Sequence, residues 1–384
     1  MVRRRACGDN GIRRGAPAKV AQDAFLWMHS RREFLLTTLI VPASAAAGSV
    51  LPSERRVIVD PTTEFRMVRL TDPSHASFLP APANRAVARR GQFLVYSADR
   101  EGAMQPYRME TGSGVAKQIV QAEGLKPESL FLTSDDKMLF FADSAGIHRT
   151  PFSGREREIY HWAEGYEGGS GLGLSLDGMY AAAVETRPKH WRLRLVSVRN
   201  GPVTLVDSEE PISFPSIRPR RDSVAYLRGD SSLWLVNFDG SQNRKLALTA
   251  GGLGPVFWSP DGRSVLYLSV PEDPAHAVAI REFFPDTNQD RWVTDTSKYA
   301  TFAPNGDASV FAGASASKAS PYLSLLVRRA HRELTIAEHR ASDPRLVTAM
   351  FSPNSQRLFF QTDREGKMCL YMMNTERLVA ETED

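Results

Sequence analysis

The chain has little cysteine, and its basic charge is confined to one end. Only Cys7 and Cys369 occur in 384 residues. Cys369 stands in an apolar segment, so we predict a buried, unpaired thiol and a fold that depends on its hydrophobic core. The net charge is +4, and residues 1–27, with six basic and two acidic side chains, account for all of it. The neutral remainder argues against nucleic acid or an anionic membrane surface as a partner.

Long hydrophobic runs are also missing. The apolar run at residues 35–41 is too short to span a bilayer as a helix. It follows S-R-R-E-F-L at 30–35, which matches the twin-arginine export motif, and precedes small residues at 43–47, where signal peptides are cleaved. We therefore predict a leader at residues 1–47, with Met28 as the true start. The mature protein is expected in the periplasm or outside the cell, with no membrane span.

Local motifs for metal binding or nucleophilic catalysis are absent as well. The eight histidines form no H-x-H, H-x-x-H or H-E-x-x-H pair, so the sequence signals no local metal site, and we predict no cofactor. Ligands that converge from distant parts of the chain stay open as an alternative. The glycine-rich run at 168–173 completes neither a G-x-S-x-G motif nor a phosphate-binding loop.

The chain does contain a repeated strand–turn–strand unit. The unit is clearest at 252–270, where expected strands at 255–258 and 264–270 flank the tight turn S-P-D-G at 259–262. Asp-Gly and Asn-Gly tolerate the positive φ that a tight hairpin requires. Turns of this kind recur at residues 90–91, 135–136, 177–178, 221–222, 261–262, 305–306 and 354–355.

The spacing of these seven turns, in the forties of residues, is typical of a propeller blade. We predict an all-β fold, a seven-bladed β-propeller with four-stranded antiparallel blades. It occupies residues 65–378, after a linker at 48–64 and before a tail at 379–384. The last blade lacks an outermost strand, so residues 65–71 are expected to pair with 368–373 and close the ring.

Sites in propellers usually lie where residues just before each innermost strand line one mouth of the central channel. These positions are cationic and aromatic here, which suits an anionic or sugar-like ligand. The candidate ligand-binding residues are His75, Tyr166, Lys298, Tyr299 and Arg345. The alternative is that they are ordinary solvated rim residues.

Several motifs resemble the oligogalacturonate lyase family, seven-bladed propellers related to the TolB-type repeat. They are R-L-T-D-P at 69–73, P-S-I-R-P at 215–219, L-W-L-V-N at 233–237, F-W at 257–258 and F-S-P-N at 351–354. The similarity covers most of residues 65–375. It implies cleavage of oligogalacturonate by β-elimination, in which a base removes the proton next to the uronate carboxylate. A histidine-bound divalent metal and an arginine stabilise the resulting charge.

Most positions that this resemblance assigns to the reaction lack a suitable side chain. Phe214 replaces the base histidine, Pro255, Leu346 and Thr348 replace metal histidines, and Asp343 replaces a metal glutamine. None of the first four can act as a base or metal ligand in place of imidazole. Arg192 alone keeps its family position, that of the catalytic arginine.

Three functions are consistent with this pattern. The favoured one is an exported lyase-like propeller that has lost the metal-dependent β-elimination and binds an acidic, uronate-type oligosaccharide. The second is a TolB-like scaffold for a protein partner in the periplasm. The third is an active lyase for pectin fragments whose site residues have moved. Whether the protein is an enzyme is left open by the sequence.

Overall fold

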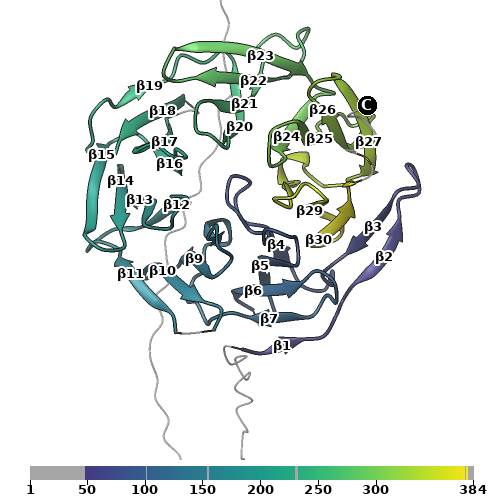
Figure 1. Ribbon diagram of the computed structural model, residues 1–384, viewed down its shortest axis with the longest axis horizontal. Helices are drawn as coiled ribbons and strands as arrows, with labels where there is room; N and C mark the ends of the chain where they lie inside the picture. Colours follow the sequence, from purple (N-terminus) through teal and green to yellow (C-terminus); the bar gives the residue numbers. More distant parts are fainter. Residues whose placement is uncertain (1–47, 101, 154, 230–231, 377, 379–384) are drawn as a thin grey trace, which may run out of the picture. The chain divides into compact units, whose positions relative to one another are not determined.

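The computed structural model describes residues 48–376 and 378, except 101, 154, 230 and 231 (Figure 1). The predicted leader at 1–47 and the tail at 379–384 lie outside the described residues. Within the described part of the chain, no helix is both long and apolar enough to cross a membrane.

Seven antiparallel sheets follow one another along the chain and form a ring of blades, which we number 1 to 7 (Figure 1). Blade 1 contains β4 (Ser77–Phe78), β5 (Phe93–Asp99), β6 (Met104–Glu110), β7 (Ala116–Gln118) and β1 (Val50–Leu51). Blade 2 contains β8 (Phe131–Leu132), β9 (Met138–Ala142), β10 (Gly146–Pro151) and β11 (Arg157–His161). Blade 3 contains β12 (Glu167–Leu174), β13 (Tyr180–Arg187), β14 (His190–Ser197) and β15 (Gly201–Ser208).

The later blades repeat this order. Blade 4 contains β16 (Ile212–Ile217), β17 (Ser223–Arg228), β18 (Ser232–Asn237) and β19 (Arg244–Lys245), and blade 5 contains β20 (Gly252–Trp258), β21 (Val265–Val270), β22 (Ala279–Phe284) and β23 (Gln289–Asp295). Blade 6 contains β24 (Tyr299–Pro304), β25 (Val310–Ser315), β26 (Tyr322–Val327) and β27 (Arg332–Glu338). Blade 7 contains β28 (Ala349–Phe351), β29 (Arg357–Glu365), β30 (Lys367–Asn374), β3 (Arg66–Arg69) and β2 (Arg56–Val59). Two short 3-10 helices, η1 (Pro127–Ser129) and η2 (Pro344–Leu346), precede β8 and β28.

The seven-bladed all-β fold predicted from the repeat is confirmed, and blades 2 to 6 have the four predicted strands. Strand β3 pairs with β30, with Val68 opposite Met372 and Arg69 opposite Tyr371. Blades 1 and 7 each gain a fifth strand, because β1 pairs with β7 and β2 pairs with β3. Both added strands fall within residues 48–64, which the sequence analysis assigns to a linker.

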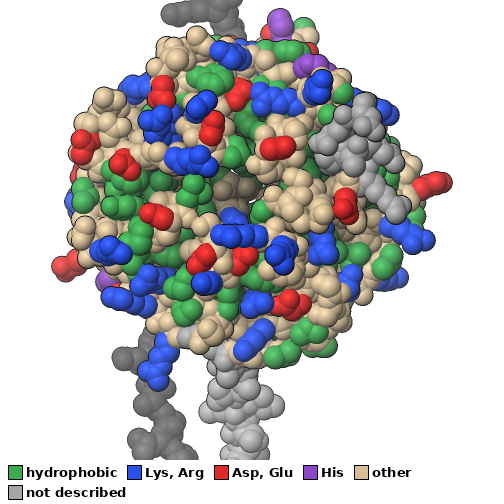
Figure 2. All heavy atoms as spheres, viewed as in Figure 1, with side chains coloured by type: hydrophobic (Ala, Val, Ile, Leu, Met, Phe, Trp, Pro, Cys, Tyr) green, Lys and Arg blue, Asp and Glu red, His purple; other side chains and the backbone are tan. Residues whose placement is uncertain are grey.

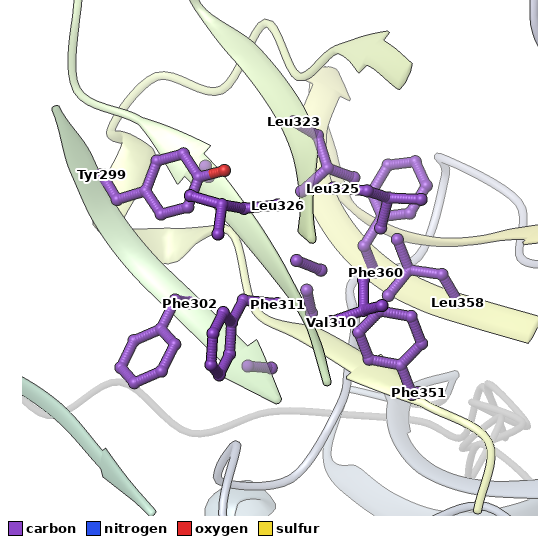
Figure 3. Close-up of a cluster of buried hydrophobic side chains, with 14 of the residues drawn as sticks. Tyr299, Phe302, Val310, Phe311, Leu323, Leu325, Leu326, Phe351, Leu358 and Phe360 are labelled. Carbon is purple, nitrogen blue, oxygen red and sulfur yellow. The ribbon is translucent and has the colours of Figure 1, made fainter. Parts of the chain in front are cut away.

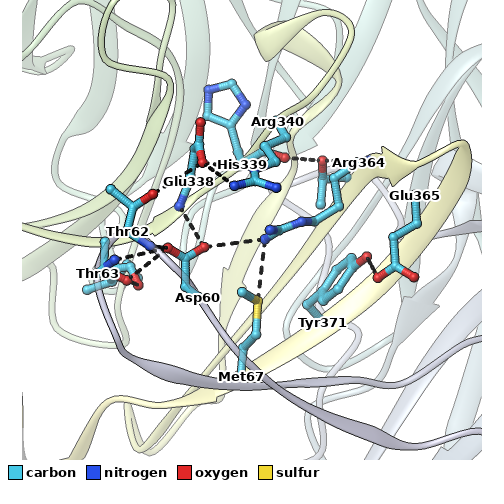
Figure 4. A network of polar contacts seen from close by, with 12 residues as sticks. Asp60, Thr62, Thr63, Met67, Glu338, His339, Arg340, Arg364, Glu365 and Tyr371 are labelled. Atoms are coloured by element: carbon cyan, nitrogen blue, oxygen red, sulfur yellow. Dashed lines mark hydrogen bonds and ion pairs between the residues drawn. The ribbon is translucent and has the colours of Figure 1, made fainter.

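The turn between β2 and β3 is fastened to blade 6 by Asp60 (Figure 4). The buried carboxylate accepts hydrogen bonds from the backbone N–H groups of Thr62, Thr63 and Glu338. The Arg364 guanidinium lies 3.6 Å away. Burial alone would raise the pKa of Asp60, but these hydrogen bonds and the charge of Arg364 lower it overall. The N-terminal strands are thus held by a satisfied buried charge.

The hydrophobic core fills the space between neighbouring blades (Figure 3). Between blades 5 and 6, the ring of Phe302 lies 5.1 Å from that of Phe257 and 6.0 Å from that of Phe311, in edge-on contacts that aromatic pairs favour. Cys369 belongs to the same hydrophobic cluster, where it is buried and unpaired as predicted. Burial raises the pKa of its thiol to about 11.

One face of the ring carries mixed charge. In the face shown in Figure 2, basic and acidic side chains are interspersed and form no continuous patch of one sign. This matches the neutral composition of residues 28–384.

Candidate functional site

Two arginines stack on Tyr166 at the entrance to blade 3. Tyr166 directly precedes the innermost strand β12, while Arg187 ends β13 and Arg192 lies on β14. The guanidinium carbons of Arg192 and Arg187 lie 4.2 Å and 4.8 Å from the centre of the tyrosine ring. Stacking on an aromatic face holds a guanidinium in place without neutralising its charge. Contact with Tyr166 therefore leaves the positive charge of each arginine available to a carboxylate.

A histidine and an aspartate complete this group. His190 Nδ1 lies 3.0 Å from the Tyr166 hydroxyl, and His190 Nε2 lies 2.6 Å from Asp207 Oδ1. The hydroxyl donates to Nδ1 when Nε2 carries the proton shared with Asp207. The other Asp207 oxygen forms an ion pair with Arg192 Nε at 3.4 Å, without a hydrogen bond between them. We call Tyr166, Arg187, His190, Arg192 and Asp207 the blade 3 cluster.

The blade 3 cluster is partly exposed to solvent. The Asp207 side chain is 54% exposed and that of Arg192 is 27% exposed, while Tyr166 is buried beneath them. The Nε atom of Arg192 is itself buried and makes no hydrogen bond within the described residues. The cluster thus contains a guanidinium, that of Arg192, with one N–H group that makes no hydrogen bond to any described residue, and beside it the exposed carboxylate of Asp207.

The other predicted ligand-binding residues do not join this cluster. His75 Nδ1 lies 2.8 Å from the backbone oxygen of Asp99, and Lys298 is exposed without an ion pair among the described residues. Arg345 is exposed and paired with Asp343 at 2.7 Å. Only Tyr166 and Arg192 of the predicted set are brought together.

Tyr299 lies in the core instead of at the mouth. It is 2% exposed, and its ring packs where Gly313 has no side chain: a Cβ on Gly313 would fall 2.0 Å from the ring. The hydroxyl is buried without a hydrogen bond among the described residues, and burial raises its pKa well above the ordinary value. A residue in this position supports packing and does not face a ligand.

An inner loop, residues 79–87 between β4 and β5, occupies the centre of the ring (Figure 1). Residues 82–87 line a cavity with blades 5, 6 and 7, and residues 81–84 line a second cavity with blades 3, 4 and 5. The loop is anchored by Asn84, whose amide donates to the backbone oxygens of Glu128 and Leu130 at 3.0 Å and 3.2 Å. One segment that faces so many blades must lie close to the propeller axis.

The second of these cavities, of about 310 Å³, we call the apolar cavity. Phe214 from β16 and Pro255 from β20 both line it, and none of the described lining residues is charged. Phe214 is 51% exposed and forms part of its rim. The cavity therefore lies where the resemblance places a base and a metal ligand.

Comparison with known proteins agrees with this architecture. The chain is 22% identical to the oligogalacturonide lyase of Pectobacterium atrosepticum and 21% identical to the oligogalacturonate lyase of Dickeya dadantii. Each alignment covers 85% of this chain and 97% of the relative. A solved oligogalacturonate lyase in complex with manganese superposes with a TM-score of 0.79 at 23% identity, over 86% of this chain and 98% of that one. The fold is that of an oligogalacturonate lyase-like propeller.

A second solved oligogalacturonate lyase, from Vibrio parahaemolyticus, gives the same TM-score of 0.79 at 20% identity, over 86% of this chain and 99% of that one. No protein-family model matches the chain. The resemblance seen in the sequence motifs is thus confirmed over nearly the full length of these lyases.

The residues of this lyase-like propeller do not fit the divalent metal of the family. Phe214 and Pro255 have no lone pair to offer a cation. Leu346 ends η2 with an apolar side chain, and Asp343 caps the same helix by accepting from the Arg345 N–H at 2.9 Å. Among the described residues, no group of three or more His, Cys, Asp or Glu side chains is placed to hold a metal ion. No step of a reaction can therefore be assigned to a metal here.

Sequence reasoning missed His190, Asp207 and Arg187. None of them stands in a motif, because Tyr166 and His190 are 24 positions apart and meet only through sheet pairing. The signal that could have found them is register: Arg192 pairs with Asp207 across β14 and β15, and Arg187 pairs with His190 across β13 and β14. Pairing the strands of blade 3 outward from the turns that connect them would place Arg187 opposite His190 and Arg192 opposite Asp207.

Proposed function

We propose that this propeller binds an acidic, uronate-type oligosaccharide at the blade 3 cluster and does not carry out metal-dependent β-elimination. The observation that supports binding is the buried, unbonded Arg192 Nε beside an exposed carboxylate. A ligand carboxylate that displaces Asp207 gains a charge-assisted hydrogen bond that the free protein does not make. Arg187, exposed on the same tyrosine ring, supplies a second positive charge.

The loss of elimination is supported by the chemistry at the base position. Elimination needs a group that takes the proton next to the uronate carboxylate. Phe214 stands at that position, and its phenyl ring cannot accept a proton. The imidazole of the blade 3 cluster, that of His190, is held between the Tyr166 hydroxyl and Asp207.

The proposal is tested with trigalacturonate as the probe. Because a ligand that binds the folded state stabilises it, we expect trigalacturonate to raise the midpoint of thermal unfolding in a concentration-dependent way. The ultraviolet absorbance of unsaturated uronate should stay flat with Mn²⁺ present. No shift of the midpoint would overturn the binding proposal, and a rising absorbance would show that elimination persists.

We further propose that the protein works outside the cytoplasm, on the basis of the S-R-R-E-F-L motif at 30–35. A reporter fused behind residues 28–47 should leave the cytoplasm, and the double change Arg31→Lys and Arg32→Lys should retain it. Export of the double variant at the normal level would contradict twin-arginine targeting.

A scaffold for a periplasmic protein partner is a second candidate. It is favoured by the inner loop, whose apolar residues occupy the centre of the ring and leave less room there for a polymer. A partner that co-purifies from periplasm and whose capture survives loss of Arg192 would support this candidate over sugar binding.

A further inference from the structure

The apolar cavity combines the size of a small-molecule site with a lining that excludes charge. Its volume of about 310 Å³ is within the range of ligand sites. The lining comes from the inner loop and from β12, β16, β17, β18 and β20, and its described residues include no acidic or basic side chain. An anionic uronate would leave its carboxylate unpaired there, which is unfavourable. The cavity therefore calls for a ligand different from that of the blade 3 cluster.

The rim of the cavity holds a residue in an unusual conformation. Phe214 has a φ of +48°, within a bulge between Ser213 and Ser216. Strand β12 of blade 3 also contains a bulge, and there the residue with positive φ is a glycine, Gly171, at +88°. A Cβ on Gly171 would lie 2.8 Å from the Phe214 Cα, so the glycine makes room for this phenylalanine. Strained backbone of this kind at a bulky residue is found preferentially at ligand sites.

One polar atom on the wall can orient a ligand. The Asn84 side chain uses its NH₂ group for the backbone oxygens of Glu128 and Leu130, which fixes the orientation of the amide. No described residue donates a hydrogen bond to its Oδ1 atom, which is not fully enclosed although Asn84 as a whole is only 6% exposed. This oxygen is an acceptor, so it pairs with a ligand that carries a donor such as a hydroxyl.

We propose that the apolar cavity binds a small uncharged aromatic molecule that carries a hydroxyl group, a phenol in chemical class. The aromatic ring packs against Phe214 and Trp258, and the hydroxyl donates to Asn84 Oδ1. This site is independent of sugar binding at the blade 3 cluster. It occupies the place where the resemblance puts metal and base residues, so a ligand pocket replaces the reaction centre.

The test uses 4-ethylphenol, which is neutral at pH 7, and its charged counterpart 4-ethylbenzoate, each followed by calorimetry. We expect saturable binding of the phenol and at least a tenfold weaker response to the benzoate. Ala83 lines the cavity and is exposed, so Ala83→Trp should fill the cavity without disturbing the core and weaken phenol binding at least tenfold. Ala275→Trp, in an exposed loop, is the matched control and should leave binding unchanged.

A second readout places the ligand. Trp258 lines the cavity, so the phenol should change the intrinsic fluorescence, and Trp258→Phe should remove most of that change. Arg192→Ala should leave phenol binding intact, which separates this site from the sugar site. Absence of heat with 4-ethylphenol, equal binding of 4-ethylbenzoate, or full binding by the Ala83→Trp variant would each overturn the proposal.

Discussion

The blade 3 cluster and the apolar cavity differ in chemistry although blade 3 contributes to both. The blade 3 cluster joins two arginines, a histidine and an aspartate around one tyrosine. The apolar cavity, lined by blades 3, 4 and 5, has no charged side chain among the residues that the structure describes there. The carboxylate-binding groups lie on blade 3, whereas the positions that the family resemblance assigns to the base and a metal ligand, Phe214 and Pro255, lie on blades 4 and 5. One set can therefore be lost while the other is kept.

The largest effect is expected at a point remote from both the cluster and the cavity. Asp60→Ala leaves Arg364, which is 7% exposed at its side chain, without its carboxylate partner, and should lower the free energy of unfolding by about 3–5 kcal/mol. Urea unfolding measures this. The pKa of Asp60 is lowered from 3.8, so its stabilisation is present above that value and is lost as the pH falls through the lower folded pKa.

The Asp60→Ala variant also tests whether the blade 3 cluster and the apolar cavity bind their ligands independently of the N-terminal strands. At a temperature where it remains folded, it should bind trigalacturonate and 4-ethylphenol as the unchanged protein does. Loss of either ligand there would mean that binding depends on the N-terminal strands and not on the two local sites.

The next largest effect is expected from Arg192→Ala. Removing a guanidinium that binds a carboxylate should weaken trigalacturonate by about 1.5–3 kcal/mol, which is 10- to 150-fold. Arg192→Lys should recover only part of the affinity, because an ammonium does not make the paired hydrogen bonds. The control is Arg263→Ala, since Arg263 is 78% exposed and pairs with Asp261 in a turn. Equal affinity of the Arg192→Ala and Arg263→Ala variants would place the ligand elsewhere.

A smaller change of opposite sign is expected from Asp207→Asn. The change removes the carboxylate that competes for Arg192 and repels an anionic ligand, so calorimetry should show affinity rising by about 0.5–1 kcal/mol. The gain should shrink as salt is added. Asp261→Asn provides the matched control. Weaker binding in the Asp207→Asn variant would show that this aspartate positions the ligand through His190.

The smallest effect on stability is expected from Phe214→Gly. Glycine adopts the φ of +48° freely, so relief of strain should offset the lost packing of a half-exposed ring. Chemical unfolding should give a free energy within about 1 kcal/mol of the starting protein. Phe152→Gly, at a half-buried ring 5.4 Å from Phe93, should cost more. A larger loss of unfolding free energy for Phe214→Gly than for Phe152→Gly would show that the backbone at Phe214 is not strained.

Much of the fold is predictable because its signals are local. The tight turns at 261–262 and 354–355 and the alternating strands beside them depend on a few adjacent residues. Strands β1 and β2 escape prediction because they have only two and four residues and pair with other strands at their blade edges. Short edge strands of this kind carry little periodicity of their own.

The candidate site is less predictable because its parts meet only after folding. Arg192 is found through the family resemblance, and Tyr166 through its place before an inner strand. His190 and Asp207 join them through strand register, and Tyr299 turns inward because Gly313 leaves space for its ring. No sequence motif marks the apolar cavity. Phe214 and Pro255 indicate that the base and metal histidines of the family are missing, but they do not indicate that a cavity lies in their place.

The most direct test of binding without reaction is a calorimetric titration of trigalacturonate into the protein in the presence of Mn²⁺. Each injection should give a heat pulse that returns fully to the baseline and saturates at one ligand per chain. A signal that stays displaced from the baseline until the sugar is consumed would reveal turnover and contradict the loss of elimination. No heat at any concentration would contradict the sugar site.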